Sequence, residues 1–158
     1  MIEKIGVKTT IRELVAHKTL KPNENEVVEC ARFNRELYEK GARPSDPTMI
    51  LFHDSEDKKS CVKEILIPIE RKVEGVETKM MDPIKVAFVL YVGTDKPVEY
   101  YYEALGEFIA KNELNPSMGA CSIEAVYQPA EFGFSYGSFI DEDTPEHWKT
   151  EIMIPVEE

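Results

Sequence analysis

The chain has 158 residues, of which 42% are hydrophobic and 31% charged, and its formal net charge is −11. This length and composition are typical of one globular domain with a substantial core, or of two closely fused halves. The acidic balance argues against nucleic-acid binding by this chain, because a phosphate backbone attracts a basic surface. No apolar run is long enough to span a membrane and no secretory segment opens the sequence, so we expect a cytoplasmic protein.

Cysteine and histidine spacing gives no sign of a disulfide framework or of a metal site. We therefore expect reduced, buried thiols, and neither a metal ion nor another cofactor. An acidic chain is compatible with cationic ligands, although net charge alone locates no site. The residues concerned are Cys30, Cys61, Cys121, His17, His53 and His147.

The first element is predicted as a strand over residues 3–20, bent or bulged near residues 11–13, because apolar residues alternate along it. A helix follows, for which Asn23 or Asn25 is a suitable N-cap. Gly41 is a natural end for that helix, since glycine adopts the left-handed conformation at low cost.

The remainder of the first half is predicted as two short strands and a connector. Residues 49–52 form one apolar strand, and residues 53–60 form a polar turn. Residues 63–70 form the next strand, and the polar residues 71–83 are expected to link the two halves without a strand of their own. The first half therefore reads β-α-β-β.

The second half repeats this order. Strong alternation over residues 84–91 predicts a strand, and Pro97 is suited to the first turn of the helix that follows. Residues 121–127 form the next strand. A long loop over residues 128–147, rich in aromatic and acidic residues, leads to the closing strand at residues 148–157.

A repeated strand supports an internal duplication. Residues 64–70 and 151–157, at an offset of 87, share Glu, Ile, Ile, Pro and Glu at matching places. We therefore predict a single domain over residues 1–158, built from pseudo-repeats 3–70 and 84–157. Since side chains alternate along a strand, Glu151 should face the side opposite to its apolar neighbours Ile152, Ile154 and Val156, together with Met153.

Several motifs in this order resemble the GyrI-like family, also called the effector-binding domain of AraC- and MerR-class regulators. They are Tyr91–Gly93 after a strand, Tyr102–Leu105 in the next helix, Asp143–Pro145, and the closing strand Thr150–Val156. The resemblance covers essentially the whole chain. It implies an α+β fold of tandem duplicated β-α-β-β units, with a curved antiparallel sheet and two long helices.

The resemblance also implies a central cleft that takes amphipathic, often cationic, organic molecules. In such a cleft a desolvated carboxylate holds the cation and aromatic faces add cation–π contacts. Two departures concern the site: the family's glutamate before the Val-Tyr pair is replaced by Ala125, with Glu124 one residue earlier, and the loop 128–147 is longer than usual. No helix-turn-helix precedes the domain, so we expect a binding module that stands alone.

The residues expected to line this cleft are Glu151, Glu124, Tyr91, Tyr102, Tyr127, Trp148 and Met153. Each also has a simpler interpretation. Glu151 would otherwise be a solvated carboxylate on an edge strand, and Glu64 is its mate in the first half. Tyr101 and Tyr102 are aromatic residues on an apolar helix face, of which only one needs to turn toward the cleft.

Two classes of function remain open at this stage. The first is a small-molecule binder that acts as a sensor or sequestering protein, with no direct contact to nucleic acid or membrane. The second is a hydrolase that detoxifies reactive strained-ring compounds, with Glu151 as base and Tyr102 in support. The resemblance also includes proteins that protect a topoisomerase target, and the sequence identifies no protein interface for this role.

Overall fold

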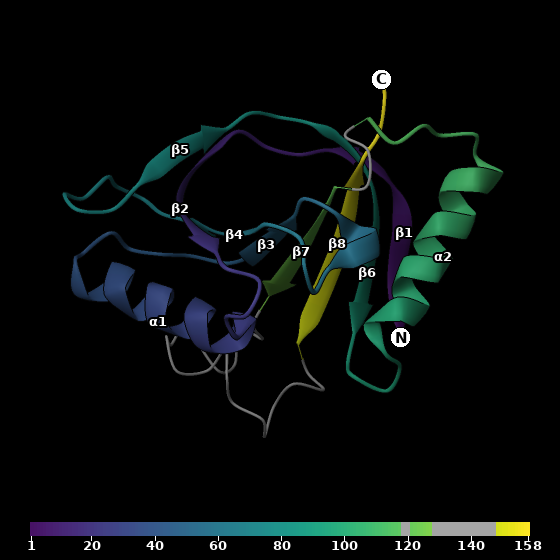
Figure 1. Ribbon diagram of the computed structural model, residues 1–158. Helices are drawn as coiled ribbons and strands as arrows, with labels where there is room; N and C mark the ends of the chain where they lie inside the picture. The colour runs from purple at the N-terminus through teal and green to yellow at the C-terminus, as the bar shows by residue number, and fades with distance from the viewer. Residues whose placement is uncertain (118–120, 128–147) are drawn as a thin grey trace.

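A computed structural model describes residues 1–117, 121–127 and 148–158, so the predicted loop over 128–147 lies outside the described residues. The chain has the α+β fold that the sequence predicts, with one curved, eight-stranded antiparallel sheet and two long helices (Figure 1). The elements are β1 Ile2–Thr9, β2 Glu13–Leu20, α1 Glu26–Glu39, β3 Thr48–Phe52, a 3₁₀ helix Ser55–Asp57, β4 Lys63–Pro68, β5 Thr78–Met81, β6 Lys85–Val92, α2 Val98–Lys111, β7 Ser122–Tyr127 and β8 Lys149–Pro155.

The strand order is β1-β6-β8-β7-β3-β4-β2-β5. From either edge inward, the outer strand (β1 or β5) is followed by the strand that precedes a helix (β6 or β2). The last strand of that half (β8 or β4) comes next, and then its middle strand (β7 or β3). The two copies of the repeated sequence, in β4 and β8, therefore take matching places in the order. The superposition of the units 3–70 and 84–157 stays a prediction.

The first predicted strand is two strands. β1 pairs with β6 of the second half, whereas β2 pairs with β4 of the first half and with β5, which lies between the two halves in sequence. The break lies at residues 10–12. There the backbone N–H of Thr10 donates a 2.9 Å hydrogen bond to the carbonyl of Ile84, and the backbone N–H of Ile84 donates a 2.9 Å hydrogen bond to Oγ1 of Thr10. Ile11 is 73% exposed at this corner. Its position in the alternating apolar pattern led to the prediction of one continuous strand, whereas the sheet has two.

The predicted connector over residues 71–83 contains β5, which the sequence analysis missed. β5 is four residues long and pairs with β2 at the edge of the sheet. An edge strand this short has one partner and little burial, so its sequence carries no clear alternation. Figure 1 shows this end of the sheet curving back toward the strands of the other half.

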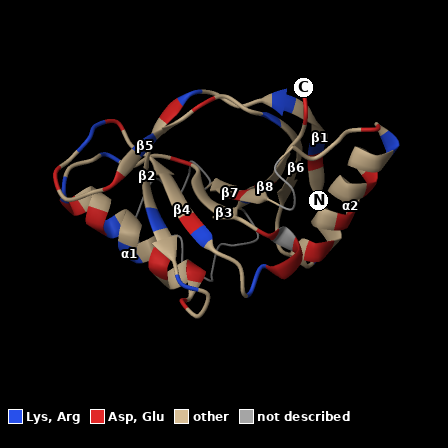
Figure 2. Cartoon of the chain, turned by 45° about the horizontal axis from the view of Figure 1, so that its top comes forward, with Lys and Arg blue, Asp and Glu red and all other residues tan. Residues whose placement is uncertain are grey.

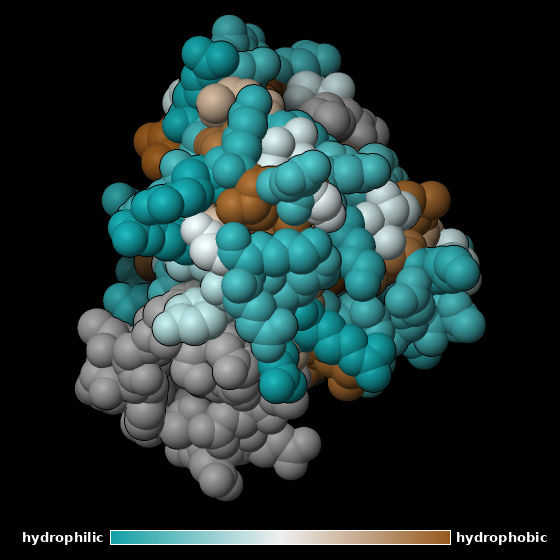
Figure 3. Space-filling view, turned by 90° about the vertical axis from the view of Figure 1, so that its left-hand side faces the viewer, coloured by the Kyte–Doolittle hydropathy of each residue, from teal (hydrophilic) through white to brown (hydrophobic). Residues whose placement is uncertain are grey.

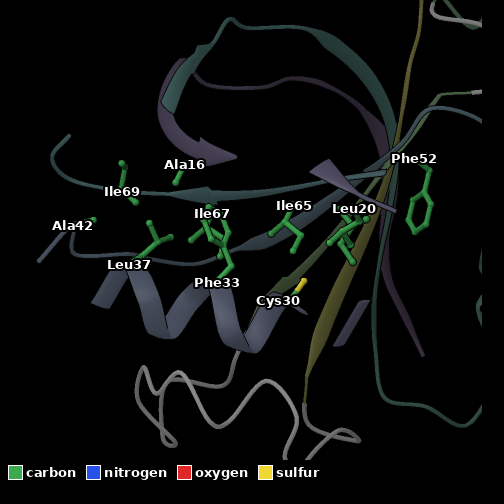
Figure 4. Packing of buried hydrophobic residues seen from close by; sticks show 11 residues of the cluster. Ala16, Leu20, Cys30, Phe33, Leu37, Ala42, Phe52, Ile65, Ile67 and Ile69 are labelled. Atoms are coloured by element: carbon green, nitrogen blue, oxygen red, sulfur yellow. The ribbon is translucent and has the colours of Figure 1, made fainter. Parts of the chain in front are cut away.

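Both helices cover the same face of the sheet, which we call the helix face. α1 begins at Asn25, whose side chain accepts a 3.0 Å hydrogen bond from the backbone N–H of Val28, and it ends before Gly41, whose φ is +77°. Apolar residues of α1 pack on β4, as Figure 4 shows for Phe33 and Leu37 near Ile67. Residues of α2 pack on β6 and β8 in the same way, around Tyr101, Leu105, Ala87, Val89 and Ile152.

The other side of the sheet, which we call the opposite face, has its own apolar cluster. It consists of strand residues that alternate with those of the helix face: Val15, Met49, Leu66, Val86, Phe88, Ile123, Ala125 and Met153. No described helix residue belongs to this cluster. The sheet is therefore covered by helices on one side, and the chain links β1–β2 and β5–β6 border the other.

The described surface is mainly hydrophilic. Acidic residues lie along α2, and residues of both signs lie along α1 (Figure 2). The side of the molecule seen in Figure 3 carries small, separate hydrophobic patches among hydrophilic residues. Neither helix is long and apolar enough to cross a membrane, within the residues that the structure describes.

Candidate functional site

The expected site residues do not share one cleft, because the structure divides them between the two faces. Glu151, Met153 and Tyr127 lie on the opposite face, whereas Glu124 and Tyr102 lie on the helix face. The structure therefore places Glu151 and Tyr102, which the sequence analysis paired in one site, on different faces of the sheet. The reason is strand parity: Glu124 stands one residue before Ala125, the neighbour of Glu151 in the sheet register, and so points to the other side.

The opposite-face cluster is built around Glu151. The glutamate side chain is only 4% exposed, and its Oε2 atom lies 2.6 Å from the Nζ atom of Lys8 on β1. The hydroxyl of Tyr127 donates a longer hydrogen bond of 3.4 Å to Oε1. The Lys8 ammonium also lies 4.8 Å from the centre of the Phe88 ring. Glu151 is thus a buried, paired carboxylate and not a solvated residue at an edge.

A cavity of about 400 Å³ opens beside this cluster. Its described lining combines apolar side chains with three carboxylates and one lysine, and it consists of Lys8, Thr9, Thr10, Ile11, Glu13, Asp46, Pro47, Met49, Met81, Ile84, Ile123, Tyr127, Glu151 and Met153. With three carboxylates and one lysine, the formal charge of the described lining is negative.

The pKa values of two lining groups are shifted in the direction that a negatively charged, buried site would produce. Burial raises the pKa of Tyr127 to about 12, and the carboxylates of Glu151, Glu13 and Asp46 all add to this rise. The charges of three acidic side chains therefore act on the Tyr127 hydroxyl, and Glu151 accepts its hydrogen bond at 3.4 Å. Burial also raises the pKa of Glu13, which makes no hydrogen bond or ion pair to another described residue.

The helix-face cluster is built around Glu124 in the same way. Its Oε2 atom lies 2.6 Å from the Tyr102 hydroxyl and 2.6 Å from the Nζ atom of Lys58. The Lys58 ammonium lies 4.7 Å from the centre of the Phe52 ring and 4.9 Å from that of Tyr102. The Ser122 hydroxyl, 2.9 Å from the Tyr102 oxygen, completes the network. This carboxylate already holds a cation between two aromatic rings.

Tyrosines around Glu124 are held in the protonated form. Burial and the Glu124 carboxylate raise the pKa of Tyr102, and they raise that of Tyr91 to about 12. Tyr91 stacks on Tyr101, with ring centres 3.5 Å apart, so Tyr101 is a core residue while Tyr102 turns to the carboxylate. Trp148 precedes β8, and its carbonyl accepts a hydrogen bond from Gly93.

Each of the repeated strands, β4 and β8, contributes the glutamate of a Lys–Glu pair whose lysine lies on another strand. The two lysines take equivalent places in the sheet. Lys8 lies opposite Val86, which pairs with Pro155 of β8. Lys79 lies opposite Val15, which pairs with Pro68 of β4. Lys79 Nζ is 3.0 Å from Glu64, as Lys8 is 2.6 Å from Glu151. Burial would raise the pKa of Glu64, but hydrogen bonds from Lys79 and His53 outweigh it and leave the pKa lowered. Glu64 is thus more fully compensated than Glu151.

The sequence analysis missed Lys8, Glu13 and Lys58. Lys8 and Glu13 flank the break between β1 and β2, and Lys58 lies in the polar turn that follows β3. A lysine in an alternating strand or a polar turn has no local signal that would separate it from a solvated residue. Among the described residues, no group of three His, Cys, Asp or Glu side chains could hold a metal ion.

No protein-family model matches the chain, and no curated protein matches it either. The fold is shared with solved structures. The C-terminal domain of EcmrR has a TM-score of 0.74 and 16% identity, over 98% of both chains. A structure of SAV2435 bound to tetraphenylphosphonium has a TM-score of 0.56 and 16% identity, over 98% of this chain and 94% of that one.

A hydrolase from Listeria innocua is also similar, with a TM-score of 0.58 and 9% identity over 98% of this chain and 92% of that one. All three likenesses extend over nearly the whole chain. At these identities they define the class of protein by its fold alone: an α+β domain of the architecture found in EcmrR and SAV2435.

Proposed function

We propose that this protein binds an amphipathic organic cation in the opposite-face cavity, as a sensor or sequestering protein. The observation that carries the proposal is the buried Glu151 at an apolar cavity whose described lining holds three carboxylates and one lysine. Such a combination of apolar wall and few convergent polar groups is typical of small-molecule sites.

The charge of the lining favours a lipophilic cation over other ligands. Such an ion loses less hydration energy on burial than a compact ammonium ion, and the net negative charge of Glu13, Asp46, Glu151 and Lys8 together compensates what it loses. An anion of equal hydrophobicity would meet the same carboxylates without compensation. We therefore expect hydrophobic cations to bind and matched anions not to bind.

The apolar part of the lining favours tolerance of ligand shape. Met49, Met81 and Met153 contribute flexible thioether side chains, which adapt to irregular ligands and make favourable contacts with aromatic rings. Tyr127 adds an aromatic face beside Glu151. This composition fits the broad specificity that the resemblance to GyrI-like domains implies.

The likeness to SAV2435 adds support of a general kind. That structure, which has the same fold, contains tetraphenylphosphonium, a lipophilic cation. The same compound is therefore the natural first probe for this chain.

Isothermal titration calorimetry with tetraphenylphosphonium tests the proposal. We expect wild type to bind and Glu151→Gln to bind about 10- to 100-fold more weakly, the scale of a charge-assisted contact. Glu64→Gln is the matched control, because it removes the same residue type from the equivalent strand, and it should bind like wild type. Equal effects of both substitutions, or tight binding of tetraphenylborate in place of the cation, would reject the site.

One observation favours hydrolysis as a second candidate, at the helix face. Tyr102 and Glu124 form a 2.6 Å hydrogen bond, and a carboxylate there could act as general base on a water molecule. Lys58 would have to leave Glu124 first. Turnover of an epoxide or cyclopropane probe that Glu124→Gln abolishes and Glu151→Gln preserves would support this candidate.

A further inference from the structure

A second cavity adjoins the first on the opposite face. It measures about 250 Å³ and shares Met81, Ile84 and Ile123 with the opposite-face cavity. The remaining residues of its described lining are mostly apolar: Leu51, Leu66, Lys79, Met80, Asp82, Cys121 and Pro155. The first cavity thus holds three carboxylates, whereas the second continues from it along a mostly apolar wall with one exposed carboxylate, Asp82.

The wall between the two cavities is adaptable. Met81 belongs to the short edge strand β5 and is only partly buried, and its unbranched thioether side chain can change rotamer without loss of packing. Ile84 is also partly buried, whereas Ile123 is fixed in the sheet. A chain of methylene groups could therefore pass from one cavity to the other beside Met81.

The far end of the second cavity does not favour a second positive charge. Lys79 lines it, and the nearby Glu64 is already held by the Lys79 ammonium at 3.0 Å and by His53 at 3.0 Å. A cationic group at that end would meet the Lys79 ammonium, and the carboxylate of Asp82 is 81% exposed to solvent and lies 3.6 Å from Arg12. The two ends of the combined space therefore suit different ends of one molecule.

We propose that the ligand is an elongated monocation, with its cationic head at Glu13 and Glu151 in the first cavity and an alkyl tail in the second. The proposal rests on the proposed function and names the ligand class of that same site. This ligand class, ammonium ions with one alkyl tail, differs from compact aromatic cations, which have no tail, and from diamines, which carry a second charge.

A chain-length series tests it. Alkyltrimethylammonium ions from butyl to decyl, kept below their micelle-forming concentrations, are titrated calorimetrically into the protein. Each added methylene should raise affinity about fourfold while the tail enters apolar space, the value expected for about 0.8 kcal/mol per buried methylene. Decane-1,10-bis(trimethylammonium), a dication of the same length, should bind more weakly than the decyl monocation.

Alkylation of Cys121 reports where the tail lies. Cys121 lines only the second of the two cavities, and burial and Glu64 raise the pKa of its thiol, so its reaction with iodoacetamide is slow and easily measured by peptide mapping. The decyl ion should slow this reaction and the butyl ion should not. Cys61, away from both cavities, is the internal control and should react at an unchanged rate.

The outcomes separate the two proposals. If butyl and decyl ions bind equally and Cys121 is not protected, the tail site is rejected while cation binding stands. If no member of the series and no tetraphenylphosphonium binds, the proposed function itself fails. In Leu51→Trp, which fills the second cavity alone, we expect the chain-length dependence to disappear while the butyl ion binds as in wild type; unchanged dependence would overturn the assignment.

Discussion

The helix-face and opposite-face clusters use the same residue types in almost the same way. In each, a lysine ammonium lies 2.6 Å from a glutamate and over a phenylalanine ring, and a tyrosine hydroxyl binds the same carboxylate. They differ in what surrounds the pair. The helix-face cluster consists of Lys58, Glu124, Phe52 and Tyr102, and the opposite-face cluster of Lys8, Glu151, Phe88 and Tyr127.

On the helix face the Glu124 carboxylate is held closely by both of its partners, Tyr102 and Lys58. Glu124 receives a 2.6 Å hydrogen bond from Tyr102, and a second aromatic ring closes on Lys58. On the opposite face the hydrogen bond from Tyr127 is 3.4 Å long, and the cavity beside Glu151 holds two further carboxylates. The residue types alone therefore do not define a binding site, because the availability of the carboxylate depends on its remaining neighbours.

The largest expected effect comes from removing Lys8. Lys8→Met leaves Glu151 buried without its cation, which should lower the free energy of unfolding by about 2–3 kcal/mol, less than for a fully buried pair because Lys8 is 37% exposed. Chemical denaturation measures this change. The double variant Lys8→Met with Glu151→Gln should recover most of the loss, since the uncompensated charge is gone, whereas Glu151→Gln alone should stay folded.

A second test compares the two tyrosines. Tyr102→Phe removes the 2.6 Å hydrogen bond to Glu124 and should cost about 1.5 kcal/mol, the scale of a bond to a charged group. Tyr127→Phe removes a 3.4 Å bond and should cost less than about 0.5 kcal/mol. If thermal or chemical unfolding shows equal losses of stability, the two Tyr–Glu hydrogen bonds are equally strong and the contrast between the faces fails.

Alkaline titration sharpens the comparison further. The pKa values of Tyr91 and Tyr127 are raised from 10.0 to about 12 in the folded state. A raised pKa stabilises the fold fully below pH 10, and this contribution is lost as the pH rises through about 12, because the unfolded tyrosines ionise first. The absorbance of phenolate should therefore show a late-titrating component that Tyr127→Phe reduces. Complete titration of all tyrosines near pH 10 in the wild type, or a late component that Tyr127→Phe leaves unchanged, would contradict this.

The smallest expected effect concerns Glu64, the compensated counterpart of Glu151. Its lowered pKa means that its contribution to stability is complete above the ordinary value of 4.5 and is lost as the pH falls through the lowered folded value. His53→Ala removes one of its two supporting hydrogen bonds and should cost only about 0.2 kcal/mol at neutral pH, the low end for an exposed pair, with a slightly earlier acid transition. An effect as large as that of Lys8→Met would mean that the two pairs are equally buried.

Local pattern predicted most of the elements. Alternation located β6 and β7, helical periodicity located both helices, and Asn25 and Gly41 mark the ends of α1 as their conformational preferences require. Two features were missed: the break that separates β1 from β2, and the short edge strand β5. Both depend on which strand lies alongside, and a partner distant in sequence leaves no trace in local alternation.

Sequence by itself also determined the side to which Glu151 points. Its parity relative to Ile152 follows from the geometry of any strand, and Ile152 packs against α2 as expected. Only the tertiary structure decided what Glu151 meets there. Lys8 comes from a strand 143 residues earlier, and Tyr127 and Glu13 arrive from two further strands. Ion pairs and cavities arise from the register between strands, and that register is decided by the packing of the whole sheet and not by any one segment.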